Sequence, residues 1–195
     1  MRRAAAIAFI LLAGTAHAGP EDSAVRVTSR QPGGITDGGS GVVIGASGGR
    51  SFIVTNEHVL GRHRDQIYCY LPSEGRYAKA TVERADARRD VAVLSVAGKW
   101  PAAGLVVEPP PAGTRLTLWG FPKGQEEPRA VTGQVVGFHG SIDGVPSFVT
   151  TVRSEDGDSG GGQFDAEGRL VCLSRTAGGS TVSLHDIFKI MGGDK

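Results

Sequence analysis

The sequence predicts an all-β protein that folds as two six-stranded antiparallel β-barrels with a short C-terminal helix. Thirty glycines and ten prolines among 195 residues divide the chain into short apolar runs, and long helical periodicity is scarce. About six such runs lie on each side of a proline-rich stretch, which favours two similar barrels over one sandwich. With 39% hydrophobic and 21% charged residues, the composition is typical of a globular chain.

The first eighteen residues predict a secretory signal peptide. Arg2 and Arg3 precede an apolar run, and Ala16-His17-Ala18 has the small-x-small pattern of a cleavage site. Because the apolar run is short for a membrane span, we expect export to the periplasm or the medium, with no membrane association after cleavage. An uncleaved N-terminal anchor is the alternative. The mature chain is then residues 19–195, beginning with a loose terminus.

The first barrel is expected over residues about 23–98. Its apolar runs are rich in β-branched residues and several alternate with polar ones, as strands do. ASGGR, between two of these runs, is typical of a hairpin turn, and PSEG joins the next pair. The expected strands are AVRVTSR, GVVIG, SFIVT, QIYCYL, RYAKATVER and DVAVLSV, and QPGGITDGG is an expected loop.

Residues about 99–113 are an expected linker, because the prolines there cannot donate to a sheet ladder. The second barrel is expected over about 114–184, from TRLTLWGF, RAVTGQVVGF, PSFVTTVR, GQFD and RLVCLSRT. A C-terminal helix is expected over about 184–192, where apolar residues share one helical face: Leu184, Ile187, Phe188 and Met191.

Charge and cysteine content narrow the function classes. The formal net charge of +1 becomes −1 once the two arginines of the signal are removed, so we expect no nucleic-acid partner. Cys69 and Cys172 lie within apolar runs, which favours two buried free thiols over a disulfide, although an exported chain could oxidise them. No Cys/His spacing indicates a metal site, and no cofactor is expected.

Polar residues stand at the ends of three expected strands. His58 follows SFIVT within TNEHVL, Asp90 precedes VAVLSV, and Ser159 lies in the glycine-rich segment GDSGGG. Strand ends and adjoining loops are positions where a rigid scaffold presents side chains. Taken singly, each residue also has a structural explanation, as a polar loop residue, a turn former or part of a flexible loop.

Together, these residues could form a nucleophilic triad. A serine hydroxyl is a weak nucleophile at neutral pH, so a neutral histidine must take its proton while a carboxylate holds the other imidazole nitrogen. We expect Ser159 to be the nucleophile, His58 the general base and acid, and Asp90 the orienting group. The backbone N–H groups of Gly157 and Ser159 are the expected oxyanion-hole donors, since glycine leaves the backbone at 157 free to aim its N–H inward.

The chain order His, Asp, Ser and the flanking motifs resemble the trypsin/chymotrypsin-like serine proteases (S1-type), and most closely the protease domain of the HtrA/Deg-like family. The resemblance rests on motifs in the family's order over residues 39–176: GSGVVI, TNEHVL, DVAVLSV, WGFPKG, VTGQVVGF, and GDSGGG with LVCLSRT. It implies a double barrel with the active site in the cleft between the halves, a polypeptide substrate and no cofactor. We therefore expect an exported serine endopeptidase.

The resemblance also implies an edge of the second barrel that binds the substrate. Ser174 matches the position whose backbone pairs with the peptide, and its hydroxyl is expected to support Asp90 as well. Arg175 and Thr176 would continue that edge, so that a peptide could add to it as an extra strand.

Arg153 and Asp158 are the positions whose roles the sequence leaves open. Arg153, six residues before Ser159, matches the floor of the primary pocket and would favour acidic substrate side chains. An ion pair with Glu155, Asp156 or Asp158 is the favoured alternative. Asp158 stands where the HtrA-like family has Asn, and is a buried-type acid that needs a partner such as Arg153, or hydration.

Two rival functions stay open at this stage. One is a catalytically silent peptide-binding module on the same double barrel, against which the retention of His58, Asp90, Ser159 and Gly157 argues. The other is an esterase or a self-cleaving protease that uses the same residues. We expect no PDZ domain after the barrel, and a monomer is favoured.

Overall fold

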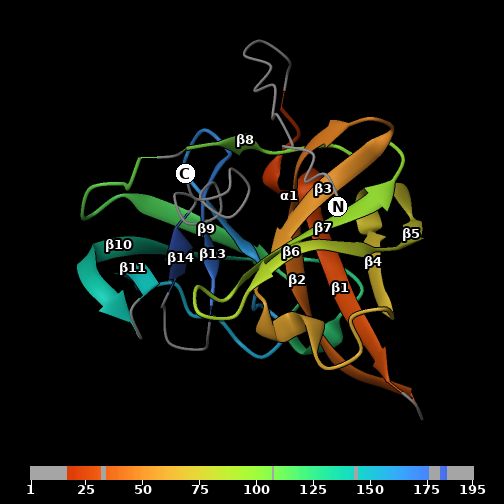
Figure 1. Ribbon diagram of the computed structural model, residues 1–195. Helices are drawn as coiled ribbons and strands as arrows, with labels where there is room; N and C mark the ends of the chain where they lie inside the picture. Colours follow the sequence, from red (N-terminus) through yellow and green to blue (C-terminus); the bar gives the residue numbers. More distant parts are fainter. Residues whose placement is uncertain (1–16, 32–33, 107, 143–144, 176–180, 184–195) are drawn as a thin grey trace, which may run out of the picture.

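The computed structural model describes residues 17–31, 34–106, 108–142, 145–175 and 181–183 (Figure 1). The first sixteen residues of the predicted signal peptide, Thr176 and the predicted C-terminal helix lie outside the described residues. Within the described ranges, no helix has the length and apolar character needed to cross a membrane.

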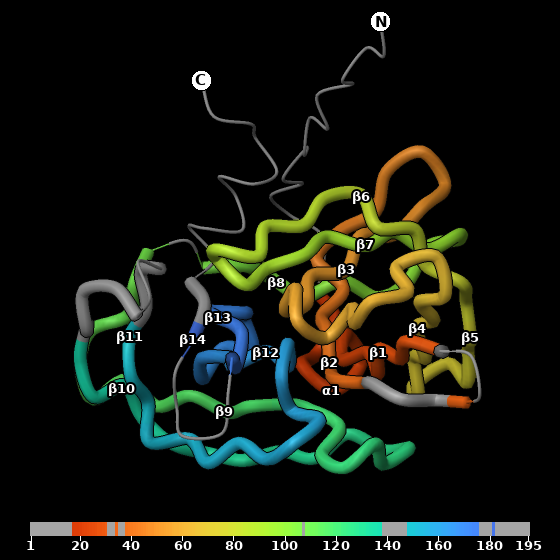
Figure 2. The backbone as a smooth tube through the Cα atoms, turned by 60° about the horizontal axis from the view of Figure 1, so that its bottom comes forward, coloured from red at the N-terminus to blue at the C-terminus, as the bar shows by residue number. Residues whose placement is uncertain are grey.

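Two curled, mainly antiparallel sheets lie beside each other, which confirms the prediction of an all-β double barrel (Figures 1 and 2). The first sheet has the strand order β5-β4-β1-β2-β3-β7-β6. Its strands are β1 (Ala24–Gln31), β2 (Gly34–Ser47), β3 (Arg50–Thr55), β4 (Ile67–Leu71), β5 (Arg76–Lys79), β6 (Thr81–Asp86) and β7 (Val91–Ala97).

The first sheet has seven strands rather than six because the run RYAKATVER is divided at Ala80. β5 pairs with β4 and β6 pairs with β7, so the two edge strands of the sheet are neighbours in sequence. At the division, the Ala80 N–H donates to the Ile67 carbonyl at 2.9 Å, and the Ala80 side chain is buried. Consecutive strands on opposite edges require the sheet to curl, which brings it toward a barrel.

The second sheet has the order β11-β10-β9-β12-β13-β14, with β8 paired to β13. β8 lies inside the predicted linker, where Gly104 and Leu105 pair in parallel with Arg169 and Leu170. This part of the linker therefore extends the second sheet. The strands are β8 (Gly104–Leu105), β9 (Arg115–Gly120), β10 (Arg129–Ile142), β11 (Val145–Thr150), β12 (Gly162–Phe164), β13 (Arg169–Ser174) and β14 (Thr181–Ser183).

Two N-terminal segments are more regular than the sequence predicts. The expected loose terminus forms the short helix α1 (Pro20–Ser23), which begins with a proline at a position where its missing N–H is not needed. The expected loop QPGGITDGG is largely strand, because β2 begins at Gly34 and pairs with β1. A register shift between Ser29 and Arg30 lets this glycine-rich part pair. The short 3-10 helices are η1 (His58–Leu60), η2 (Pro72–Glu74) and η3 (Pro122–Gly124).

A shared hydrophobic cluster joins the two halves. Val42 and Val54 of the first sheet are fully buried together with Phe164 and Leu173 of the second. Burial of each such side chain stabilises the fold by about 1.5–3 kcal/mol, so this cluster fixes the two sheets against each other. Residues that the two sheets carry next to this cluster are therefore held in fixed positions relative to one another.

The cysteines occupy separate cores. Cys69 belongs to the core of the first half and Cys172 to that of the second, and both thiols are free and buried. This confirms the prediction of two buried thiols. Burial raises the pKa of Cys69 to about 12 and raises the pKa of Cys172 as well, so both stay protonated at neutral pH.

Candidate active site

His58 stands just after the buried strand β3. The strand is buried from Ser51 to Thr55, and the chain turns into η1 at His58. Val59 and Leu60 follow into the core at 2% and 0% exposure, which anchors the backbone on the C-terminal side of His58. The His58 side chain is 47% exposed, so its ring is reachable from solvent.

Asp90 is presented by a tight turn between β6 and β7. The Asp86 carboxylate accepts the backbone N–H groups of Arg88 and Arg89, at 2.9 and 3.0 Å, which fixes the turn. Asp90 then has a φ of +53°, in the left-handed region that non-glycine residues seldom adopt. Its carbonyl accepts the side-chain amide of buried Asn56 at 2.9 Å, which holds this conformation in place.

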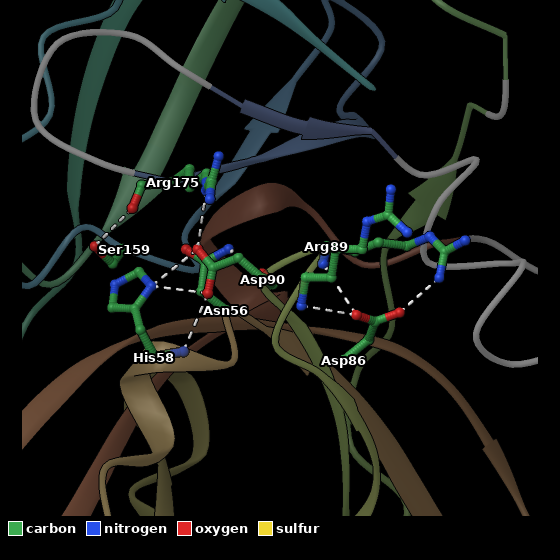
Figure 3. A network of polar contacts seen from close by, with 8 residues as sticks. Asn56, His58, Asp86, Arg89, Asp90, Ser159 and Arg175 are labelled. Carbon is green, nitrogen blue, oxygen red and sulfur yellow. Dashed lines mark hydrogen bonds and ion pairs between the residues drawn. The ribbon is translucent and has the colours of Figure 1, made fainter. Parts of the chain in front are cut away.

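The Asp90 carboxylate faces the His58 ring (Figure 3). Each carboxylate oxygen lies 2.9 Å from His58 Nδ1, and Oδ1 also accepts the His58 backbone N–H at 3.1 Å. Burial by itself raises the pKa of Asp90, but the hydrogen bonds from His58 and the Arg175 guanidinium outweigh it and hold the pKa below its usual value. The ionised carboxylate favours the tautomer with the proton on Nδ1, which leaves Nε2 able to accept a proton.

Ser159 lies in the glycine loop before β12 and is packed against the first half of the molecule. Its carbonyl accepts the backbone N–H of Ser40 at 2.7 Å. A Cβ on Gly39 would lie 2.7 Å from both the Ser159 carbonyl oxygen and Val59 Cγ2. The loop therefore packs directly beside the η1 turn that carries His58, and a glycine at 39 permits this close approach.

The Ser159 hydroxyl is hydrogen-bonded to a group other than His58. It donates to the Arg175 backbone carbonyl at 3.1 Å. Among the hydrogen bonds of the described residues, none joins Ser159 to His58. The three predicted triad residues are thus brought to one region (Figure 3), with the aspartate and histidine in direct contact and the serine hydroxyl held by a third residue.

Two N–H groups of the glycine loop are free to bind an anion. The Asp156 carbonyl accepts a backbone N–H of η3 at 2.6 Å, and the Asp158 carbonyl accepts the Gly161 N–H at 2.9 Å. In a trans peptide the N–H points opposite to the carbonyl, so the N–H groups of Gly157 and Ser159 are turned away from these partners. Within the described part of the chain, neither group donates to an acceptor. Both are available to a developing oxyanion.

Ser40 belongs to the candidate site, although the sequence did not indicate it. Its buried hydroxyl donates to the Gly157 carbonyl at 2.7 Å and accepts the Phe121 N–H at 2.9 Å. Gly157 has a φ of +96°, and a Cβ there would lie 2.8 Å from the Lys123 nitrogen, so only glycine fits. Ser40 thereby ties the loop that carries Gly157 to β2. Its place in GSGVVI was visible in the sequence, but the direction of its hydroxyl was not.

Asp158 is fully buried and pairs with Arg129, so the prediction that this acid needs a partner is confirmed, while the suggestion of Arg153 as that partner is wrong. Its Oδ2 accepts the Arg129 guanidinium at 3.1 Å and the Glu155 N–H at 2.8 Å, and Arg129 also pairs with the Glu155 carboxylate. Burial raises the pKa of Asp158, and the Glu155 N–H and Arg129 offset this only in part. Arg129 opens β10 and lies 29 residues from Asp158 in the chain, where no local spacing indicates it.

Ser174 differs from its expected roles, whereas the place of Arg175 on a substrate-binding edge stays a prediction. The Ser174 N–H donates to the Gly161 carbonyl at 2.8 Å and its carbonyl accepts the Gly160 N–H at 2.9 Å, so its backbone is engaged by the glycine loop. Its buried hydroxyl has no hydrogen-bond partner among the described residues. The expectation that this hydroxyl supports Asp90 is therefore wrong, because Arg175 Nε reaches the carboxylate instead, at 3.2 Å.

Arg153 is exposed. Among the described residues it forms none of the ion pairs with Glu155, Asp156 or Asp158 that the sequence suggested, because Arg129 and Lys123 take Glu155 and Arg129 takes Asp158. Its proposed place at the floor of a pocket stays a prediction. Thr176, the last predicted substrate-binding residue, lies outside the described residues. No group of three or more potential metal-ligating side chains is found among those that are described.

Comparison with known proteins identifies the family of this chain and structures with a similar fold. Residues 39–173 match the family model of the trypsin-like peptidase domain. The structure is similar to that of a serine endoprotease from Yersinia pestis, with a TM-score of 0.75 and 23% identity, over 88% of this chain and 62% of that one. The Rv3671c protease from M. tuberculosis, in its active form, gives a TM-score of 0.74 and 23% identity over 90% of this chain and 83% of that one.

At this level of identity the two solved structures show a shared fold. The chain spans less than two thirds of the length of the Yersinia protein, at 62%. No curated protein sequence matches the chain.

Proposed function

The chain belongs to the trypsin-like peptidase domain family, and on that premise we propose that it is an exported serine endopeptidase. The observation that carries the proposal is the placement of the Asp90 carboxylate 2.9 Å from His58 Nδ1, beside a glycine loop that holds Ser159. A peptidase domain acts on polypeptides, and neither the proposed residues nor the proposed chemistry requires a cofactor. Export is supported by the sequence of residues 1–18.

In the proposed reaction, the Ser159 hydroxyl leaves the Arg175 carbonyl and donates to His58 Nε2. Nε2 takes the proton as Oγ attacks the carbon of the scissile peptide. The C–N bond breaks as His58 returns that proton to the departing amine, which leaves an acyl ester on Ser159. A water molecule, deprotonated by His58, then hydrolyses the ester and restores the hydroxyl.

Asp90 stabilises the positive charge that His58 carries after it takes the Ser159 proton. Its carboxylate holds Nδ1–H through both oxygens, which fixes the ring and stabilises the imidazolium. The hydrogen bond from the His58 backbone N–H fixes the carboxylate in turn. Because these groups are in place before substrate binds, little reorganisation is needed during proton transfer.

The N–H groups of Gly157 and Ser159 are the proposed donors to the tetrahedral oxyanion. Each such donor lowers the barrier by about 3 kcal/mol in related chemistry. Their direction depends on carbonyls bound elsewhere, at Asp156 and Asp158, and on the Ser40 hydroxyl that holds the Gly157 carbonyl. The oxyanion hole is therefore proposed to be formed before substrate arrives.

Incubation with an unfolded, alkylated protein substrate tests the proposal, with new peptide termini identified by mass spectrometry. We expect cleavage by the mature protein and by Ser73→Ala, which removes an exposed hydroxyl, and none by Ser159→Ala. Absence of new termini with folded wild-type protein would contradict an endopeptidase. Peptide binding without cleavage would favour a silent binding module, and hydrolysis of aryl esters alone would favour an esterase.

A further inference from the structure

Arg175 contacts two of the residues that the proposed reaction uses, through different atoms. Its Nε donates to Asp90 Oδ2 at 3.2 Å, and its backbone carbonyl accepts the Ser159 hydroxyl at 3.1 Å (Figure 3). The Arg175 and Asp90 side chains are 15% and 8% exposed. The ion pair is therefore shielded from water, unlike the surface pairs that contribute little to stability.

Two other polar groups that could support Asp90 do not bind its carboxylate. The Asn56 amide donates to the main-chain carbonyl of Asp90 and not to its side chain. The Ser174 hydroxyl, next to Arg175 in sequence, has no partner in the described part of the molecule. Among the described residues, Arg175 is thus the one donor to this carboxylate besides His58.

We propose that Arg175 is a positioning residue of the active site, which holds the Asp90 carboxylate in the plane that faces His58. This inference rests on the proposed function, since it assigns a role within the same site. A guanidinium is planar, always charged and directional, so it restrains a carboxylate oxygen more firmly than a serine hydroxyl would. Because Arg175 follows β13 and Asp90 precedes β7, the contact also bridges the two halves of the molecule.

The charges around the pair predict a pH signature for this role. Asp90 contacts His58 directly and Arg175 contacts Asp90, whereas Glu57, the residue before His58, is paired with Arg64, and Asp86 of β6 is paired with Arg89. Arg175 is therefore the cation that contacts the carboxylate of the Asp90–His58 pair. Removing it makes protonation of the pair easier, so the reaction should need a higher pH.

Three variants test the proposal: Arg175→Gln removes the charge, Arg175→Lys keeps it, and Arg50→Gln removes a charge from the Arg50–Glu83 pair of the first sheet. For Arg175→Gln we expect kcat to fall about tenfold with a smaller change in KM. The acidic limb of the kcat/KM profile should move up by about half a pH unit or more. Arg175→Lys should keep the limb near the wild-type position with intermediate kcat, and Arg50→Gln should match wild type.

A second measurement separates this inference from the proposed function. The NMR resonance of the His58 Nδ1–H, assigned by its loss in His58→Ala, reports the hydrogen bond to Asp90 without any substrate. In folded Arg175→Gln, we expect it to broaden or shift and its pH midpoint to rise. An unchanged resonance and an unchanged pH limb would overturn the inference. If the resonance shifts in Arg175→Gln but the wild-type protein cleaves nothing, the proposed function is overturned while the role of Arg175 in holding Asp90 is upheld.

Discussion

Two buried aspartates, one beside each sheet, each accept an arginine, yet their pKa values move in opposite directions. Asp90 is 6% exposed and Asp158 is 0% exposed, so burial raises the pKa of both. The pKa of Asp90 nevertheless ends below its usual value, and that of Asp158 ends above it. The hydrogen-bond donors and charges around each carboxylate, and not burial alone, account for the difference.

Both oxygens of Asp90 accept hydrogen bonds, from His58 and from Arg175. Both donors to Asp158 go to Oδ2, whereas Oδ1 has no partner among the described residues and the nearby Glu155 carboxylate opposes ionisation. Asp90 is therefore suited to hold a charge opposite a forming imidazolium. Asp158 joins the loop that carries Gly157 to Arg129 of β10, the cation that favours its charged form.

The largest expected effect comes from Asp90→Asn. The amide cannot hold the Nδ1-protonated tautomer of His58, so kcat should fall by about 10⁴ in the folded variant. Peptide-cleavage rates would measure this, with circular dichroism as the check on folding. Asp65→Asn, which alters an exposed acid of the same half, should keep wild-type kcat. Equal rates for the two variants would contradict the role of Asp90.

Arg129→Met tests the other aspartate. It leaves the Asp158 charge buried without its cation, and we expect a loss of about 2 kcal/mol of unfolding free energy, below the range for fully buried pairs because Arg129 is 35% exposed. Activity should fall as well, since the loop that carries Gly157 is loosened. Urea unfolding would measure the stability. Arg169→Met, which removes an exposed arginine paired with Asp165, should lose much less.

A smaller effect is expected at Arg153, which among the described residues forms none of the ion pairs first suggested for it. If its guanidinium meets substrate, peptides with Glu before the cut should be preferred over those with Leu, and Arg153→Gln should reduce that preference about fivefold. Competitive cleavage of paired peptides that differ at this one position would measure it. Equal preference in wild type and variant would exclude Arg153 from specificity.

The smallest expected effect is a pair of opposite pH trends in thermal stability. Because the folded pKa of Asp90 is lowered, its stabilisation is present above the unfolded pKa of about 3.9 and is lost as pH falls through the folded value. The folded pKa of Asp158 is raised, so its stabilisation is present below about 3.9 and is lost as pH rises through the folded value.

Melting temperatures at pH 3 and pH 7 would show these trends. From pH 3 to pH 7, the deficit of Asp90→Asn relative to wild type should grow, and that of Asp158→Asn should shrink, each by about 2–4 °C. Parallel trends in the two variants would contradict the opposite pKa shifts.

Local pattern was sufficient to predict the strands and the region of the site. Apolar alternation and turn glycines act over a few residues, so β3, β7 and β13 lie where their runs predicted. Motif order also indicated that His58, Asp90 and Ser159 belong to one site. The prediction of a single strand over RYAKATVER was wrong. The chain changes partners at Ala80, and this change depends on the curl of the whole sheet.

Long-range side-chain partners could not be predicted in this way. Ser40 and Gly157 lie 117 residues apart in the chain, and Arg175 and Asp90 lie 85 apart. Neighbouring side chains on a strand point to opposite faces, so the choice between Ser174 and Arg175 as the residue that reaches Asp90 depends on register. A shift of one residue in register decides which of the two side chains reaches Asp90, and neither composition nor motif spacing predicts that register.

The most direct test of the account is the intact mass of the folded protein after reaction with a fluorophosphonate, with the adduct located by peptide mapping. We predict one adduct per chain on Ser159, none in Ser159→Ala, and much slower labelling of Asp90→Asn than of Asp65→Asn. A folded wild-type protein that gains no adduct, or gains it on another residue, would contradict the claim that His58 and Asp90 activate Ser159.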